Sequence, residues 1–224
     1  MRSVTIETRA GPVVCDAAKV AYLPDHDTLL MGDLHFEKAS FLQMNGHAPL
    51  PALDTQDTLE RLWDVIGRYA PAHVVALGDS FHDVDAGDRL SAKHVEAMNA
   101  LVTSVPKFTW VLGNHDPDIP KAVTGEQQDH LTLGRFLLTH LPTDSDAGEF
   151  NMCGHLHPKA RVKVRKRAIS HPCFACGENR IILPSFGTFT GGLYVSDIAI
   201  ARELHEPVQY VLTDNCAVYP ITAR

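Results

Sequence analysis

The chain lacks any apolar run long enough to cross a membrane. Its 224 residues contain no stretch that approaches the roughly 18 apolar residues of a transmembrane helix. The first segment, MRSVTIETRAGPVVCD, also lacks the uninterrupted apolar core of a secretory signal peptide. We therefore expect a protein with neither a membrane anchor nor a cleaved leader.

Cysteine is scarce, and basic residues are outnumbered by acidic ones. The five cysteines are scattered and odd in number, which does not suit a disulfide framework and predicts a reduced, cytoplasmic protein. With 20 Lys and Arg against 27 Asp and Glu, the formal net charge is −7, which disfavours broad attraction to nucleic acid or membranes. Gly/Ser-rich linkers and low-complexity tracts are also missing, so we expect residues 1–224 to form one domain.

Short apolar runs recur along the chain, and several end in residues that bind metals. These runs are TLLMGD, HVVALGD, FTWVLGNHD, RFLLTH and FNMCGHLH. Helical spacing of apolar residues predicts a helix capped by Asp54 and another over residues 89–105. Alternating strands and helices predict parallel pairing in the first half, and strands dominate from about residue 131. This order predicts two packed sheets with helices on their outer flanks.

The ends of the predicted strands supply seven candidate metal ligands. They are two carboxylates, one amide and four imidazoles: Asp33, His35, Asp79, Asn114, His140, His155 and His157. Such oxygen and nitrogen donors suit Mn, Fe or Zn at a catalytic site better than a structural zinc. Seven side chains are too many for one ion with an open position, and they predict two divalent ions, roughly 3.5–4 Å apart, that share a carboxylate. His130 is an alternative to His140, but His140 ends an apolar run and is therefore favoured.

The charges of this ligand set favour a phosphate substrate. Two divalent ions carry four positive charges, of which Asp33, Asp79 and a bridging hydroxide remove three. One net positive charge would then face a phosphoryl oxygen. The ions would also lower the pKa of the bridging water towards neutrality.

Five motifs follow one another between residues 32 and 157: GDLH, GDSFHD, GNHD, the lone histidine of LLTH, and GHLH. In this order they resemble the calcineurin-like metallophosphoesterases. The resemblance implies an α/β fold, the four-layer αββα sandwich of two mixed β-sheets flanked by helices. It also implies one metal held by Asp33, His35, Asp79 and His157, with Asp79 bridging to a second held by Asn114, His140 and His155.

The same resemblance implies that His115 is the general acid, or at least a donor that stabilises the phosphoryl charge. The second motif of the family is usually Gly-Asp-x-x-Asp, whose last Asp pairs with this histidine. GDSFHD departs from the pattern, with His82 at that spacing and Asp83 one residue later. We expect Asp83 to orient His115, and His82 and Asp116 are the alternatives.

The stretch HPCFACGENRIILPSFGTFTGGL resembles the ligase-associated DNA damage response endonucleases, a bacterial group also called PdeM-type. This resemblance implies a manganese-dependent phosphodiesterase and DNA endonuclease in DNA repair, linked to an ATP-dependent ligase, a helicase and an exonuclease. A metal-bridging hydroxide would attack phosphorus in line. The alternatives are a phosphomonoesterase acting on a small metabolite or phosphoprotein, and a non-catalytic interaction module on the same fold.

The segment KARVKVRKR, residues 159–167, has the strongest local charge, since six of its nine residues are Lys or Arg. In a strand, Arg161, Lys163 and Arg165 would share one face while the intervening valines face the core. This face is predicted to contact the phosphate backbone of DNA. The alternative is a solvated surface.

Cys173 and Cys176 form a Cys-x-x-Cys motif, but a second cysteine pair is absent. A structural zinc would need His171 and Cys153 to complete four ligands. We expect buried free thiols instead.

Overall fold

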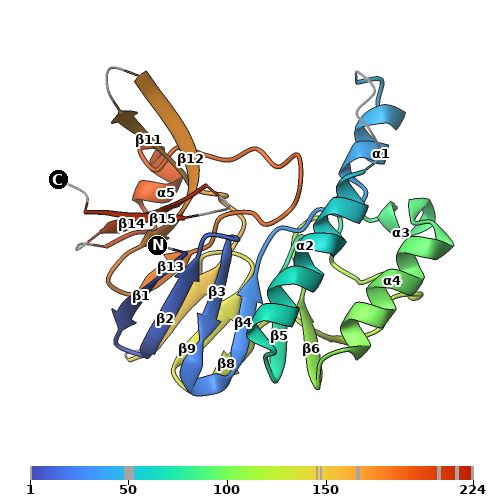
Figure 1. Ribbon diagram of the computed structural model, residues 1–224, viewed down its shortest axis with the longest axis horizontal. Coiled ribbons are helices and arrows are strands. Elements are labelled where there is room, and N and C mark those ends of the chain that lie inside the picture. The colour runs from blue at the N-terminus through green and yellow to red at the C-terminus, as the bar shows by residue number, and fades with distance from the viewer. Residues whose placement is uncertain are drawn as a thin grey trace.

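Two β-sheets lie face to face at the centre of the protein, with helices on the outer faces (Figure 1). The computed structural model describes residues 2–47, 53–144, 146, 148–164, 167–205, 208–214 and 217–222. At positions 163, 164, 167, 212 and 222 it describes the backbone only. The predicted α/β fold with two mixed sheets flanked by helices is confirmed.

The first sheet has seven strands in chain order. They are β1 (Ser3–Thr8), β2 (Gly11–Asp16), β3 (Val20–Leu23), β4 (Thr28–Met31), β5 (His73–Leu77), β6 (Lys107–Val111) and β7 (Glu126–Gln128). The short helix η1 (Pro24–His26) joins β3 to β4. The parallel pairing predicted for the first half is confirmed for β4 to β7. It is wrong for β1 to β4, which pair antiparallel because short connections rather than crossover helices join them.

The second sheet has the order β15-β14-β12-β13-β10-β9-β8. Its strands are β8 (Leu131–Leu133), β9 (Phe136–Thr139), β10 (Phe150–Cys153), β11 (Lys159–Val164), β12 (Arg167–Cys176), β13 (Arg180–Ile182), β14 (Gln209–Thr213) and β15 (Val218–Thr222). Strands β9, β10 and β13 pair parallel, and the other pairs are antiparallel. Among the described strands β11 pairs only with β12, and this hairpin projects from the sheet (Figure 1).

Helices cover the two sheets unequally. On the side of the first sheet lie α1 (Lys38–Met44), α2 (Asp54–Tyr69), α3 (Ala86–Arg89) and α4 (Ala92–Thr103) (Figure 1). The second sheet is covered by the short α5 (Ile198–Ala201), whose Ile200 packs on Ala175 and Ile182. In the described part of the chain, no helix has the length and apolar character needed to span a membrane.

The starts of two helices differ from the sequence predictions. Asp54 does not cap α2, because its carboxylate instead accepts the backbone N–H of Ala39 in α1 at 2.8 Å. Helix α4 begins at Ala92 rather than near residue 89, because the hydroxyl of Ser91 accepts the backbone N–H of His94 and caps the helix there.

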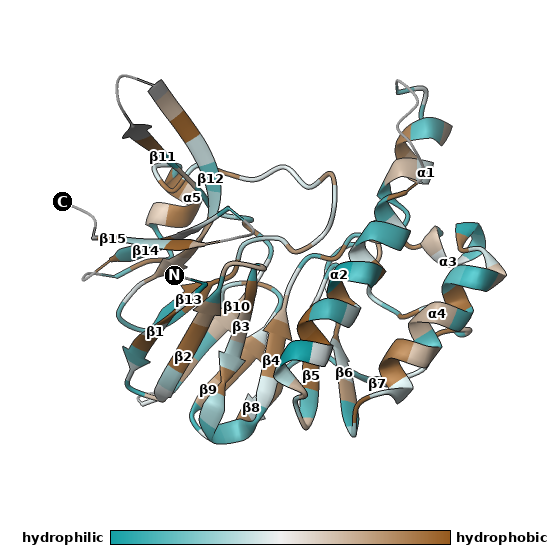
Figure 2. Ribbon diagram, viewed as in Figure 1, coloured by the Kyte–Doolittle hydropathy of each residue, from teal (hydrophilic) through white to brown (hydrophobic). Residues whose placement is uncertain are grey.

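Strand β5 shows why the apolar runs form buried strands. Successive side chains of a strand point to opposite faces. Val74 and Ala76 therefore pack under the helices, and Val75 and Leu77 pack between the sheets. Full burial of a side chain such as Leu77 contributes about 1.5–3 kcal/mol. In Figure 2 brown dominates in the central strand β4, whereas α2 and α4 carry both colours, as expected for helices with one face in solvent.

Candidate metal centre

The candidate ligands lie in loops that follow the carboxyl ends of strands. Asp33 follows β4, Asp79 follows β5 and Asn114 follows β6, and these strands pair parallel. Parallel strands bring such loops to one edge of the sheet. The backbone N–H of Asp33 donates to the carbonyl of Gly78 at 3.1 Å, and that of His35 donates to the carbonyl of Asp79 at 3.0 Å. Hydrogen bonds thus join the loops before any metal is considered.

Two adjoining clusters of side chains are able to hold metal ions. The first cluster comprises Asp33, His35 and His157, and the second cluster comprises Asp79, His140 and His155. Within each cluster the ligand atoms lie within 4.8 Å of one another. The clusters adjoin, because Nδ1 of His140 lies 4.0 Å from Oδ1 of Asp33. All six residues belong to the ligand set predicted from the sequence.

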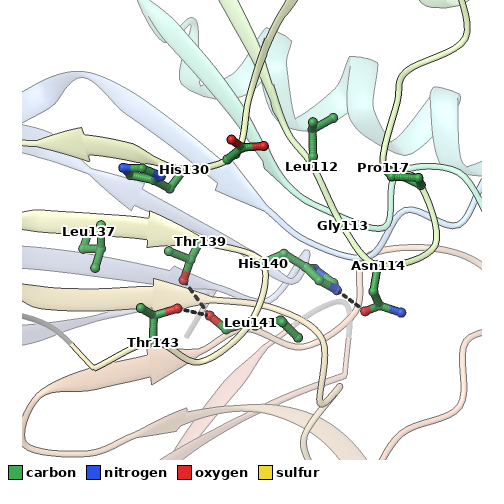
Figure 3. A pocket seen from close by; sticks show the side chains of 11 residues that line it. Leu112, Gly113, Asn114, Pro117, His130, Leu137, Thr139, His140, Leu141 and Thr143 are labelled. Carbon is green, nitrogen blue, oxygen red and sulfur yellow. Dashed lines mark hydrogen bonds between the residues drawn. The ribbon is translucent and has the colours of Figure 1, made fainter.

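The second cluster gathers atoms that all carry lone pairs. Nδ1 of His140 lies 3.0 Å from the carbonyl oxygen of Leu77, to which it donates, so its Nε2 carries no proton when the ring is neutral. This Nε2 faces Oδ1 of Asn114 at 2.9 Å (Figure 3), Nδ1 of His155 at 3.2 Å and Oδ1 of Asp79 at 3.3 Å. Four such atoms repel one another unless a proton or a cation lies among them. The cluster therefore fits a divalent ion.

The first cluster contains buried nitrogens that lack hydrogen bonds. Nε2 of His35 and Nε2 of His157 are buried and have no hydrogen-bond partner among the described residues. Nε2 of His157 lies only 3.0 Å from Oδ1 of Asp33, yet the two atoms are not aligned for a hydrogen bond. A buried polar atom left in this state costs about 1–3 kcal/mol. Coordination of a shared cation would satisfy both nitrogens.

At His35 and Asp79 the environment favours the protonation states that bind cations, whereas at His140 the nearby Asp79 and Asp33 raise the pKa in spite of burial. Burial lowers the pKa of His35 to about 2, and the charges of His157 and Lys38 act in the same direction. Burial works against ionisation of Asp79, but the hydrogen bond from His140 lowers the pKa of Asp79 well below its usual range. Neutral imidazole and ionised carboxylate are the forms that coordinate metals.

The backbone is strained at most of the candidate ligands. Asp33, His35, Asp79, His155 and His157 all have φ between +44° and +67°, the left-handed region. This conformation costs roughly 1–2 kcal/mol for a residue other than glycine. Strain concentrated in one place is typical of sites whose geometry serves binding or catalysis.

The glycines that precede the ligands leave space for the other loops. A Cβ atom at Gly78 would lie 2.5 Å from the ring of His140, and one at Gly154 would lie 2.6 Å from Oδ2 of Asp33. Gly78 also has φ +75°. A side chain at either position would push a ligand out of its cluster.

His115 lies at the rim of the centre and packs against His82. Its side chain is 44% exposed, and its Nε2 is 3.9 Å from Oδ2 of Asp79. The rings of His82 and His115 are nearly parallel, with centroids 5.5 Å apart. Nδ1 of His82 also lies 3.3 Å from Nδ1 of His35, so one ring contacts both the candidate acid and a candidate ligand. Such outer partners fix the orientation of metal ligands.

The structure does not bring Asp83 to His115. Asp83 forms a two-point ion pair with Arg89 and accepts the backbone N–H of Asp85. Asp116 is buried, and its carboxylate accepts backbone N–H groups of the loops after β5 and β6, including that of Gly113 at 2.9 Å. Of the three candidates for orienting His115, His82 is the one in ring contact with it.

Lys38 stands near the centre although no ligand motif includes it. It opens α1 three residues after His35 and is partly buried. Burial, and next to it the charge of Lys38, lower the pKa of His82 to about 4. A cation here adds to the positive field that a phosphate group would meet. In the sequence, Lys38 could have been noticed as the basic residue that ends the segment DLHFEK.

A groove of about 540 Å³ opens beside the second cluster (Figure 3). Asn114 and His140 line it on the side of the second cluster, and its apolar lining comes from Leu112, Leu137, Leu141 and Pro117. His130 lines this groove and belongs to neither cluster, in agreement with the preference for His140 as ligand.

The basic segment forms β11, in the projecting hairpin. Arg161 is exposed, and its Nη2 donates to the hydroxyl of Tyr194 at 2.9 Å. The guanidinium of Arg161 and the ammonium of Lys159 lie 4.7 and 4.8 Å from the centroid of the Tyr194 ring. The side chain of Lys163 is not described, and Arg165 lies outside the described residues. The predicted shared basic face is therefore visible at Arg161 alone.

The Cys-x-x-Cys motif does not form a metal site in the part of the chain that the structure covers. Cys173 and Cys176 lie on β12, are buried and carry no disulfide. Neither belongs to a group of three potential ligands among these residues. Both are the buried free thiols that the sequence predicts.

Comparison with known proteins relates this chain to phosphoesterases. Residues 27–170 match the calcineurin-like phosphoesterase family. The chain is 26% identical to the nuclease MPE of Pseudomonas putida, with a TM-score of 0.78, and the match covers 98% of this chain and 100% of that one. It is 15% identical to Yfce, a phosphoesterase from E. coli, with a TM-score of 0.46 over 88% of this chain and 99% of that one. No curated protein sequence matches the chain.

Proposed function

Because the chain belongs to the calcineurin-like phosphoesterase family, we propose that it is a metal-dependent phosphodiesterase that cuts DNA. The observation that carries this proposal is the adjoining pair of clusters, in which each imidazole or carboxylate offers a ligand atom. The similarity to a nuclease over almost the whole chain supports DNA as the substrate. A cytoplasmic role in DNA repair, beside a ligase, a helicase and an exonuclease, belongs to the same proposal.

Two divalent ions fit the centre. Asp33, His35, Asp79 and His157 would hold one, and Asp79, Asn114, His140 and His155 would hold the other. We propose manganese, and the same oxygen and nitrogen donors also accept iron or zinc. When bound, the ions supply positive charge beside the phosphoryl oxygens and lower the pKa of coordinated water.

His115 is proposed to act as the general acid. Hydrolysis forms a bond from a water oxygen to phosphorus and breaks the bond to the ester oxygen. That oxygen leaves with a proton, and His115 is exposed at the rim where it could donate one. The stacked ring of His82 limits the positions that the His115 ring can occupy. Its place beside Asp79 puts the donor next to the candidate ligands.

The groove beside the second cluster favours a diester over a monoester. A diester carries an organic group on each side of the phosphate, whereas a monoester carries one. The groove offers about 540 Å³ for a group next to Asn114 and His140. On the side of the first cluster, His157 leads into β11 and its exposed Arg161. A phosphomonoester has one organic group and would occupy only one of these two sides.

A substrate panel tests the proposed function. In the presence of Mn²⁺ we expect kcat/KM for bis(p-nitrophenyl) phosphate to exceed that for p-nitrophenyl phosphate by at least about tenfold, since differential binding of the second ester group lowers the barrier. We also expect internal nicking of DNA when single strands, duplexes and hairpins are compared. Preference for the monoester with DNA left intact would favour the phosphomonoesterase. Absence of all hydrolysis and of metal binding would favour the interaction module.

Reversing the charge of Arg161 is expected to weaken cleavage of DNA. A contact to backbone phosphate releases counterions. The slope of log kcat/KM against log salt should therefore become less steep by roughly 1–2 in Arg161→Glu, about 1 for the lost positive charge and up to about 1 more for the added negative charge. The rates on an oligonucleotide and on bis(p-nitrophenyl) phosphate are measured at several salt concentrations. Lys93→Glu, an exposed position on α4, is the matched control. Equal losses on both substrates would mean that Arg161 affects the centre rather than the DNA backbone.

A further inference from the structure

A second, smaller pocket adjoins the first cluster and shares no lining residue with the groove. It has a volume of about 100 Å³ and shares His157 with that cluster. Lys19 and Lys159 line it, together with Ser185, Thr190 and Gly191. We call it the lysine pocket.

Lys19 is held in the lysine pocket without an acidic partner. It lies in the turn between β2 and β3 with φ +66°, and among the described residues its ammonium forms no ion pair. Burial, and after it the charge of Arg61, lower the pKa of Lys19 to about 8. The nearby carboxylate of Asp57 is already bound by Arg61 at 3.0 Å and by the hydroxyl of Thr188 at 2.5 Å. Lys19 therefore has no carboxylate in ion-pair contact among the described residues.

Lys159 adds a second cation to the lysine pocket. It lies two residues after His157, at the start of β11, and its ammonium contacts the ring of Tyr194 at 4.8 Å. It too has no ion pair within the part of the chain that is described. In a protein with 27 acidic and 20 basic residues, two lysines gathered in one pocket without a carboxylate indicate that an anion is the missing partner.

We propose that the lysine pocket binds the phosphate that neighbours the scissile phosphate in a nucleic acid strand. The proposal rests on the proposed function, because it requires a phosphate held at the clusters. His157 lines both the pocket and the first cluster, so an anion in the pocket would lie directly beside that phosphate. A volume of about 100 Å³ has room for a phosphate group, whereas the larger groove by the second cluster has room for a base and sugar. The chain thereby selects a polynucleotide over a diester with a single phosphate.

The test is Lys19→Met, which keeps the length of the side chain and removes its charge. The salt dependence of kcat/KM is measured with Mn²⁺ for a single-stranded oligonucleotide and for bis(p-nitrophenyl) phosphate. Loss of one phosphate contact should reduce the slope of log kcat/KM against log salt by about 0.7 on the oligonucleotide. At low salt kcat/KM should fall on the order of tenfold, as for a lost hydrogen bond to a charged group. Lys19→Arg should restore the slope, and Lys93→Met is the matched control on α4.

The outcomes separate this inference from the proposed function. A wild-type protein that hydrolyses neither substrate contradicts the proposed function itself. Hydrolysis of both substrates with an unchanged slope for Lys19→Met overturns the lysine pocket as a phosphate subsite. Inhibition by inorganic phosphate is measured in parallel on the small diester. If Lys19→Met weakens that inhibition and leaves the slope for the oligonucleotide unchanged, the pocket binds free phosphate. The proposal that it binds a phosphate of the nucleic acid strand would then be wrong. A melting temperature lowered by several degrees would assign Lys19 a structural role instead.

Discussion

Asp79→Asn is expected to lower kcat/KM on a phosphodiester by at least about 1,000-fold, which corresponds to about 4 kcal/mol of lost transition-state stabilisation. Asp79 lies in the second cluster, with Oδ1 at 3.3 Å from Nε2 of His140. It also contacts the first cluster, because its backbone carbonyl accepts the N–H of His35 at 3.0 Å. A carboxylate placed this way offsets the repulsion between two divalent ions, and asparagine has the same shape without the charge.

Metal binding supplies a readout that does not depend on activity. Manganese at about 100 times its Kd stabilises the folded state by about 2.7 kcal/mol. For a chain of this size that raises the melting temperature by roughly 5–10 °C. We expect the wild-type protein to show this shift and to hold two ions per chain, and Asp79→Asn to lose most of both. Thermal melts and elemental analysis measure the two quantities.

Asp118→Asn is the control for Asp79→Asn, because it removes the same charge at an exposed position beyond the GNHD motif. It should retain activity, metal content and melting shift. If Asp79→Asn kept two ions and activity within tenfold of wild type, Asp79 would not be the ligand on which the pair of sites depends.

Much of the centre could be predicted because local rules decide it. An apolar run that ends in Asp or His places that residue at the carboxyl end of a buried strand. The parallel pairing of β4, β5 and β6 then brings Asp33, Asp79 and Asn114 to one edge. The sequence shows Gly78 as part of the GDSFHD motif. That Gly78 leaves space for the ring of His140 can be seen only in the folded structure.

Two carboxylates show how the folded chain selects one partner among several that the sequence allows. Asp54 has the character of a helix cap, yet its carboxylate is taken by Ala39, which lies 15 residues earlier. Asp83 has the chemistry to orient a histidine, yet Arg89 on the next helix pairs with it. Local propensity cannot rank such competing partners, because the winner is set by tertiary packing.

The lysine pocket likewise could not be predicted from the local sequence. Lys19 stands in a hairpin turn where an exposed lysine would be the ordinary expectation. It lines a site only because that turn packs beside residues 185–191, more than 160 positions later. The left-handed backbone of five candidate ligands is likewise invisible in the sequence, since only a few per cent of residues other than glycine adopt that region.

His115→Asn is expected to separate proton donation from metal binding. General acid catalysis contributes typically 10²–10⁴-fold, so kcat/KM on an oligonucleotide should fall within about that range. His115 belongs to neither cluster, and its side chain is 44% exposed at the rim. The melting shift produced by Mn²⁺ should therefore remain close to that of wild type. His47→Asn, at an exposed position outside the centre, is the control and should change neither quantity.

The leaving group decides which role His115 has. A deoxyribose oxygen is strongly basic and must be protonated as it departs, whereas p-nitrophenolate departs without a proton. If His115 is the acid, His115→Asn should lower kcat/KM on bis(p-nitrophenyl) phosphate by less than about tenfold, far below the loss on DNA. If His115 instead stabilises the charge of the phosphoryl group, both substrates should lose activity equally, because that charge develops whichever group leaves. A matched loss with an unchanged melting shift would therefore reject His115 as the proton donor while keeping it at the centre.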